Sequence, residues 1–248
     1  MMQINWPLII VLFCLSLPGV LIAVPRLIYL LLPENSEQLK KRLSKLAVAQ
    51  TLLMVFLMCF AGAVLSVRTG LNAALLDSLL QGKTISGDIA GILPVFLYTI
   101  GGLVVFFILY YGVVGSLLDE ASLQIMRRIR AVLHLDGCIL YGGVVEEILG
   151  RWGLMNVIAF FAIFFAGEKS PAVMWSAIFL SGLLLTAGHI PAYLAAGCQA
   201  SRRFIYAMLL LHGWQAILFG WLFWQYGFIA TVVAHMIFHL GWYLYDRT

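Results

Sequence analysis

The sequence predicts an all-α, polytopic membrane protein: a single bundle of about seven transmembrane helices over residues 1–248. The chain is 63% hydrophobic and only 10% charged, and its mean hydropathy is +1.01. Soluble domains are typically about half apolar and about a quarter charged. The apolar runs are long and continuous and do not alternate with polar residues, as the strands of a β-barrel would. The composition therefore favours a helical membrane domain, and no feature of the sequence indicates nucleic-acid binding.

Seven apolar runs approach or exceed the length of about 20 residues that a helix needs to cross a bilayer. They are Trp6–Val24, Leu46–Val67, Ile89–Val114, Cys138–Phe165, Ala172–His189, Phe204–Tyr226 and Phe228–Tyr245. Leu27–Leu32 is a candidate continuation of the first run, which Pro18 and Pro25 are expected to kink or end. In the third run, Gly101 and Gly102 predict close contact with another helix.

Two of the connecting segments are expected to lie on the membrane surface. Leucines recur at helical spacing in Leu71–Leu80, inside the connection Arg68–Asp88, which indicates a short surface helix. Leu117–Leu135 is predicted to be a second surface segment. Its three arginines are Arg127, Arg128 and Arg130. The remaining connections are Pro33–Lys45, Ala166–Pro171 and Pro191–Arg203.

The cysteines and the first residues support two further expectations. The four cysteines form no Cys-x-x-Cys pair, and we predict buried thiols rather than a disulfide framework or a cysteine metal site. They are Cys14, Cys59, Cys138 and Cys198. Residues 1–6 carry no positive charge, so a cleavable secretory signal is not expected.

The placement of lysines and arginines predicts the orientation in the membrane. If the N-terminus is outside, the loops after the first, third and fifth runs and the C-terminal tail are cytoplasmic, and these segments hold eleven of the fifteen basic residues. The opposite side holds three, Arg68, Lys83 and Lys169. Cytoplasmic loops usually carry this excess. We therefore predict an external N-terminus, a cytoplasmic C-terminus and multi-pass insertion in the plasma membrane; the sequence does not predict the oligomeric state.

Charged residues inside the fourth run are the strongest functional signal. Glu146, Glu147 and Arg151 lie within Cys138–Phe165, and ionisable residues at membrane depth are costly and usually mark function. On a helix Glu147 and Arg151 share a face and can form an ion pair, whereas Glu146 points about 100° away and is free to face a cavity. A structural charge cluster between packed helices is the alternative interpretation.

Histidines provide possible partners for these glutamates. His189 ends the fifth run, and His235 and His239 are four residues apart on one face of the seventh. At about 1.5 Å per residue, Glu146 and these three histidines reach a common layer in the cytoplasmic half of the bilayer. Such a group favours a catalytic site, although a lone histidine in a helix is more often structural. His134 and His212 are interpreted as structural.

Three motifs in chain order resemble those of the CAAX protease and bacteriocin-processing family of intramembrane endopeptidases. Glu146–Arg151 is similar to the family's EExxxR motif. Leu185–His189 resembles its FxxxH motif, with leucine in place of phenylalanine, and His235–His239 resembles its HxxxN motif, with histidine in place of asparagine or aspartate. Gly220 and Gly227 match the glycine-containing segment that precedes the third motif. The resemblance covers a core of about residues 132–245.

The resemblance implies an intramembrane endopeptidase that acts on a small membrane-associated peptide or protein. By this likeness Glu146 activates a water molecule with help from His189. His235 donates to the oxyanion with His239 beside it, and the glutamate–arginine ion pair holds the helix and the local field. Removing an oxyanion donor often costs about a hundredfold or more in rate.

Other functions remain open at this point. A non-proteolytic protein of the same fold, such as a bacteriocin-immunity factor or a scaffold, is one alternative. An ion-coupled transporter with a buried proton relay is another, although no duplicated halves with broken helices are visible. We expect no cofactor, because the resemblance implies a hydrogen-bonding side chain at His239, a role that a neutral histidine fills through a ring N–H. A zinc-dependent variant remains possible because two histidines four apart on a helix are a common metal-binding pair. Its ligands would be Glu146, His189, His235 and His239.

Overall fold

The computed structural model describes residues 4–83 and 89–246, and within these residues the chain forms helices and no strands. The predicted all-α fold is therefore confirmed. The helices are α1 (Trp6–Leu31), α2 (Glu37–Thr69), α3 (Ala74–Leu80), α4 (Ile89–Phe107), η1 (Ile108–Val114), α5 (Gly115–Leu117), α6 (Glu120–Gly137), η2 (Cys138–Glu146), η3 (Ile148–Met155), α7 (Asn156–Ala166), α8 (Pro171–Ala195), α9 (Arg202–Tyr226) and α10 (Phe228–Asp246). The three η elements are π-helical.

Seven helical stretches in the described part of the chain are long and apolar enough to cross a membrane, which matches the predicted number. Many large apolar side chains face outward, among them Ile92, Leu97 and Phe165 with exposed fractions of 67%, 60% and 80%. Exposed apolar surface of this extent fits a lipid environment rather than water. The outward leucines, isoleucines and phenylalanines thus agree with the composition.

Several helices are longer than the apolar runs that predict them. Helix α1 continues through Pro18 and Pro25 to Leu31, so neither proline ends it, and α8 continues through Pro191 to Ala195. A proline interrupts the backbone hydrogen bonding of a helix, but transmembrane helices tolerate it because neighbouring helices and local adjustments satisfy the freed groups. Helix α2 begins at Glu37, so most of the segment expected to be a polar connection is helical.

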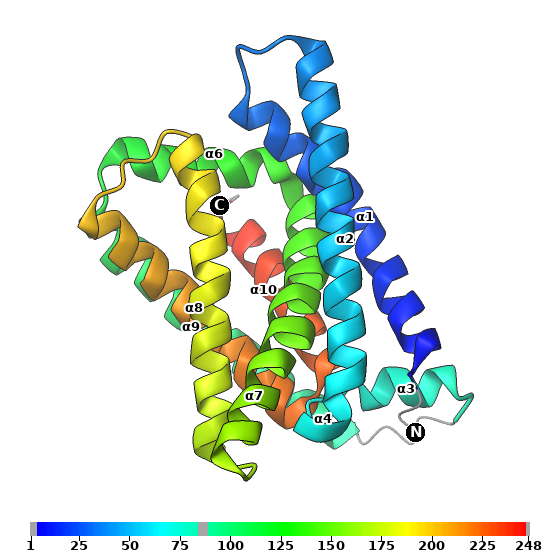
Figure 1. The fold of residues 1–248 in the computed structure, drawn as a ribbon. Helices are drawn as coiled ribbons and strands as arrows, with labels where there is room; N and C mark the ends of the chain where they lie inside the picture. The colour runs from blue at the N-terminus through cyan, green and yellow to red at the C-terminus, as the bar shows by residue number, and fades with distance from the viewer. Residues whose placement is uncertain (1–3, 84–88, 247–248) are drawn as a thin grey trace.

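The two predicted surface segments are helical. Helix α3 lies inside the predicted Leu71–Leu80, while residues 84–88 of the connection Arg68–Asp88 lie outside the described residues. Helix α6 runs across one end of the bundle (Figure 1). The carboxylate of Asp119 caps this helix by accepting the backbone N–H of Ser122 at 2.8 Å and its hydroxyl at 3.1 Å. These hydrogen bonds hold the pKa of the Asp119 carboxyl below its usual value.

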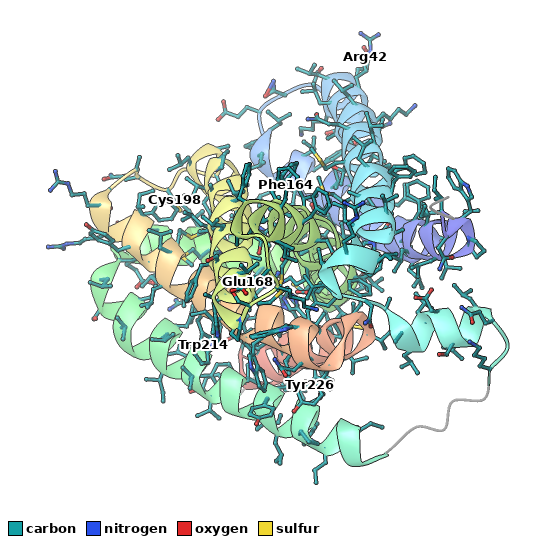
Figure 2. The ribbon with its side chains drawn as sticks, turned by 60° about the horizontal axis from the view of Figure 1, so that its bottom comes forward. Arg42, Phe164, Glu168, Cys198, Trp214 and Tyr226 are labelled. Carbon is teal, nitrogen blue, oxygen red and sulfur yellow. The ribbon has the colours of Figure 1, made fainter. Side chains whose placement is uncertain are left out.

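The loops predicted to share a side of the membrane lie at the same end of the bundle. The turn between α1 and α2, helix α6 and the loop between α8 and α9 gather at one end in Figure 1, and the α7–α8 turn lies at the other. Figure 2, viewed from below, shows Arg42 projecting from the far end of α2, while Glu168 of the α7–α8 turn faces the viewer. The orientation of these ends relative to the cytoplasm stays a prediction.

The stretch η2–η3 occupies the middle of the bundle, between α1, α2, α8 and α10 (Figure 1). Gly142 and Gly143 allow α10 to pack directly on η2. A Cβ atom at Gly143 would lie 2.6 Å from Met236 Cγ, and one at Gly142 would overlap the ring of His239. In α4 only one of the two predicted contact glycines has this role, because a Cβ at Gly102 would overlap Leu218 whereas one at Gly101 would meet open space.

Candidate active site

The adjacent residues Glu146 and Glu147 contact histidines from different helices. Glu146 ends η2, and its Oε1 lies 3.0 Å from Nε2 of His189 in α8. Glu147 joins η2 to η3, and its Oε1 lies 2.6 Å from Nδ1 of His235 in α10. The four-residue spacing predicts an ordinary α-helix here, whereas the structure has π-helix on both sides of Glu147. Short π-helical stretches occur frequently at functional sites.

Glu147 is the centre of a buried network that joins three helical segments. Its Oε1 also lies 3.3 Å from Nη1 of Arg151, so the ion pair expected from the four-residue spacing is present. Nη2 of Arg151 donates to the carbonyl oxygen of Gln215 in α9 at 3.1 Å, and the Thr231 hydroxyl lies 3.4 Å from Glu147 Oε2. The exposed fractions of Glu147, Arg151 and His235 are 0%, 4% and 2%. Glu147 is therefore placed to hold helices together rather than to touch a substrate.

Four of the six predicted site residues line one cavity of about 380 Å³, which we call the catalytic cavity. They are Glu146, His189, His235 and His239. Apolar side chains from α1, α6, α8 and α9 complete its wall, including Leu27, Met126, Leu185 and Leu211. Ligand sites commonly combine a mostly apolar wall with a few converging polar groups. The glutamate and the histidines predicted to share a layer thus meet in one cavity, and Glu147 and Arg151 are not part of its wall.

The contacts of His189 define where its protons can be. Its Nδ1 lies 2.8 Å from the carbonyl oxygen of Leu185, which can only accept, so Nδ1 carries a hydrogen. In the neutral ring Nε2 then has a lone pair and cannot donate to Glu146. The 3.0 Å contact between His189 Nε2 and Glu146 Oε1 is a hydrogen bond only when one further proton resides on either atom. The pair is thus arranged to hold and exchange a single proton.

His239 has no partner for its polar atoms. Both ring nitrogens are buried and have no hydrogen-bond partner among residues 4–83 and 89–246. The ring stacks on His235 with centroids 4.7 Å apart and an interplanar angle of 16°. Buried polar groups are nearly always hydrogen-bonded, and leaving one unpaired is costly. Because His239 lines the catalytic cavity, a bound ligand or water could satisfy these nitrogens.

Two residues of α9 that belong to none of the predicted motifs also line the catalytic cavity. His212, which was interpreted as structural, stacks on His189 with ring centroids 4.7 Å apart and lines the catalytic cavity together with Gln215. The same depth arithmetic could have found it: His212 is eight residues from the predicted start of its run at Phe204, or about 12 Å, the depth of Glu146. It was overlooked because it belongs to none of the three motifs.

No zinc site is preformed among the described side chains. Within the described part of the chain, no group of three or more histidine, cysteine, aspartate or glutamate side chains is arranged to hold a metal ion. Both nitrogens of His189 are occupied, by Leu185 O and Glu146, and Nδ1 of His235 is occupied by Glu147. Binding zinc through Nε2 of His189 would require its contact with Glu146 to separate, whereas the contact of His235 with Glu147 uses Nδ1 and could remain.

Comparison with known families agrees with the motifs. Residues 129–241 match the family model described as type II CAAX prenyl endopeptidase Rce1-like. The match contains all six predicted site residues and confirms the resemblance to the CAAX protease family. Searches of curated proteins and of solved structures found no match.

Proposed function

Because residues 129–241 carry an Rce1-like domain of the CAAX-type intramembrane protease family, we propose that the protein is an intramembrane endopeptidase in which Glu146 activates water. The observation that carries this proposal is the Glu146–His189 pair, 3.0 Å apart on the wall of a cavity inside the bundle. A carboxylate and an imidazole that exchange one proton form a general acid–base pair. The substrate is a peptide or protein associated with the membrane.

A small cavity beside Glu146 has the size of one water molecule. Its volume is about 10 Å³, and about 10–15 Å³ suffices for one water with two to four polar partners. Polar residues on its wall are Glu146, Arg151, Thr186, His212, Gln215 and His235. Water held here would lie within reach of the Glu146 carboxylate. This arrangement supports hydrolysis and adds His212 and Gln215 to the groups that position the water.

The proton of the Glu146–His189 pair accounts for both halves of peptide hydrolysis. In the first step the Glu146 carboxylate takes a proton from water, and the water oxygen bonds to the peptide carbonyl carbon. In the second step Nε2–H of protonated His189 gives its proton to the leaving nitrogen as the C–N bond breaks. The proton on Glu146 then passes to His189, which restores the starting pair. The products are a carboxylic acid and an amine.

The geometry favours His239 over His235 as the neutral donor to the oxyanion. Nδ1–H of His235 is directed to Glu147, so Nε2 of a neutral His235 ring carries a lone pair and can donate only after protonation. His239 has neither nitrogen committed, so its neutral ring can donate one N–H to the oxygen. Glu147 would stabilise a protonated His235 and orient its ring, as carboxylates do for catalytic histidines.

Cleavage by purified protein tests this proposal against a scaffold or immunity role. We expect wild-type protein in nanodiscs to cleave members of a peptide library and the Glu146→Gln protein to cleave none. Glu168→Gln, which removes a carboxylate from the exposed α7–α8 turn, is the matched control and should keep wild-type activity. Absence of cleavage by wild-type protein, or full activity of Glu146→Gln, would contradict the glutamate mechanism.

A further inference from the structure

A second cavity of about 300 Å³ lies beside the catalytic cavity, and its wall is rich in basic groups. We call it the basic cavity. Its wall includes Arg127, Arg130 and His134 of α6 and Asp246 of α10. It shares four wall residues with the catalytic cavity, among them Arg130 and His239. The two cavities are therefore neighbours, separated by side chains that both contact.

The wall of the basic cavity has an excess of positive charge. Arg127 and Arg130 are three residues apart on α6, where like charges repel each other. Among the described residues of this wall, Asp246 is the one carboxylate, and its Oδ2 lies 2.5 Å from Nη1 of Arg130. Arg127 pairs with Glu120 at 3.5 Å, and its side chain is 58% exposed. An anionic ligand would relieve the repulsion between the two guanidinium groups.

Arg130 is held in place before any ligand arrives. Its Cζ lies 3.6 Å from the centroid of the Trp242 ring, and only 15% of its side chain is exposed. A guanidinium has five N–H donors in a planar fork that matches a carboxylate. The Asp246 contact engages Nη1, so other N–H groups remain for a ligand. A preformed donor loses little conformational entropy on binding, which strengthens recognition.

The shared wall indicates which molecule would occupy the basic cavity. His239, with its unpartnered nitrogens, contacts both cavities and is the proposed donor to the scissile carbonyl. A peptide whose carbonyl lies at His239 would extend from there along the wall toward Arg130. The occupant of the basic cavity is then the continuation of the substrate chain itself.

We propose that the basic cavity is a substrate subsite that binds a carboxylate of the peptide through Arg127 and Arg130. The inference rests on the proposed endopeptidase function and names the charge that its substrate carries. The carboxylate belongs either to the C-terminus of the peptide or to an acidic side chain near the cleaved bond. Both sources present the same group to the arginines, and synthetic peptides can separate them.

Neighbouring arginines provide a matched test. Arg127→Gln removes a guanidinium from the wall, whereas Arg128→Gln removes one from an exposed position of the same helix that is not part of the wall. The probes are N-acylated library peptides made as free acids, as C-terminal amides, and as amides with one glutamate. For peptides with a carboxylate we expect Arg127→Gln to raise KM about tenfold with little change in kcat, as loss of one charge-assisted hydrogen bond would.

The same peptides also give the control results and the results that would overturn the subsite. Arg128→Gln should behave as wild type, and neutral peptides should have a high KM that Arg127→Gln does not change. The free acid and the glutamate-containing amide show which carboxylate is bound. Equal effects of the two arginine variants, or equal KM for charged and neutral peptides, would overturn the subsite. A loss of activity on Arg127→Gln in phosphatidylglycerol nanodiscs but not in phosphatidylcholine nanodiscs would identify a lipid headgroup instead.

Failure of the subsite can be distinguished from failure of the proposed function. Peptide binding is measured directly on Glu146→Gln protein, with and without Arg127→Gln, in nanodiscs. If wild-type protein cleaves nothing but the carboxylate peptides bind in an Arg127-dependent manner, the protease proposal fails and the subsite stands. If peptides with and without a carboxylate bind equally, the subsite is wrong whatever the activity.

Discussion

At the scale of single residues, the two neighbouring glutamates have separate environments, and this difference supports the separate roles proposed for them. The side chain of Glu146 is 21% exposed and faces the catalytic cavity, whereas that of Glu147 is fully buried against Arg151 and His235. A group that activates water must touch the cavity, and a group that orients a histidine need not. The spacing of the motif predicted this division, but it did not predict the contact between Glu147 and His235.

Glu147→Gln should lower the stability of the protein more than Glu146→Gln does. Removing one partner of a buried ion pair leaves the other charge uncompensated, which typically costs about 3–5 kcal/mol. We expect a clear drop in the apparent Tm in detergent for Glu147→Gln and a near wild-type Tm for Glu146→Gln, measured by thermal unfolding. Equal Tm values for the two variants would show that the ion pair of Glu147 and Arg151 does not stabilise the folded protein.

His239→Asn should retain activity within about tenfold of wild type, whereas His239→Ala should lose about a hundredfold or more, as expected for removal of an oxyanion donor. The asparagine side chain supplies an N–H at this position and the alanine side chain does not. Cleavage rates of the two purified variants provide the test.

A chelator should leave wild-type activity unchanged. If chelation abolishes cleavage, zinc restores it and His239→Asn is inactive, then the site is a metal centre and the role given to His239 is wrong.

At the scale of elements, close packing between η2 and α10 brings two segments of the candidate site together. Glycines at 142 and 143 leave room for His239 and Met236, so that His235 can reach Glu147. Arg26 of α1 supports the start of this segment, because Nη1 donates to the carbonyl of Leu133 at 2.6 Å and pairs with Asp136 at 2.7 Å. The contact lies beside His134, whose φ of 55° marks the bend from α6 into η2.

Gly143→Ala should impair the proposed cleavage by forcing α10 away from η2. The new Cβ would lie 2.6 Å from Met236 Cγ and 3.3 Å from its backbone nitrogen, and such overpacking typically costs about 1–3 kcal/mol. We expect reduced cleavage and a lower Tm. Gly101→Ala is the matched control, since its Cβ would meet nothing within 4 Å. If both variants behave as wild type, the close approach of α10 is not required for activity.

At the scale of the whole molecule, the bundle places the catalytic cavity toward the end that carries α6. The predicted cytoplasmic loops gather at this same end (Figure 1). If the charge distribution determines orientation, the cavity is reached from the cytoplasmic side. Substrate peptides would then approach from the side on which most Lys and Arg residues lie.

Reporter fusions test the orientation directly. A reporter fused after Thr248 should be cytoplasmic, and one inserted at Lys169 should be external, because basic residues are retained on the cytoplasmic side. Alkaline phosphatase and green fluorescent protein fusions at both positions give opposite signals on the two sides. A result reversed at either position would move access to the catalytic cavity to the other side of the membrane.

The sequence predicted those features that the bilayer imposes and missed those that depend on packing. Seven spans follow from run length, since a helix must satisfy its backbone across a fixed thickness. The continuation of α8 through Pro191 depends on neighbouring helices, which no local pattern records. The same holds for the π-helical turns around Glu147 and for the stacking of His212 on His189. Motifs identify residues that share chemistry, but His212 joins the site only through the path of α9.

The buried network around Glu147 also constrains how the protein is made. The ribosome delivers the segment with Glu146, Glu147 and Arg151 before it delivers α8 and α10, so this segment reaches the membrane without either histidine partner. During that interval the local pair of Glu147 and Arg151 is the charge compensation available within the segment. Arg151 would thus stabilise the segment during insertion and the buried network after folding. Its loss would appear as poor insertion of newly made chains.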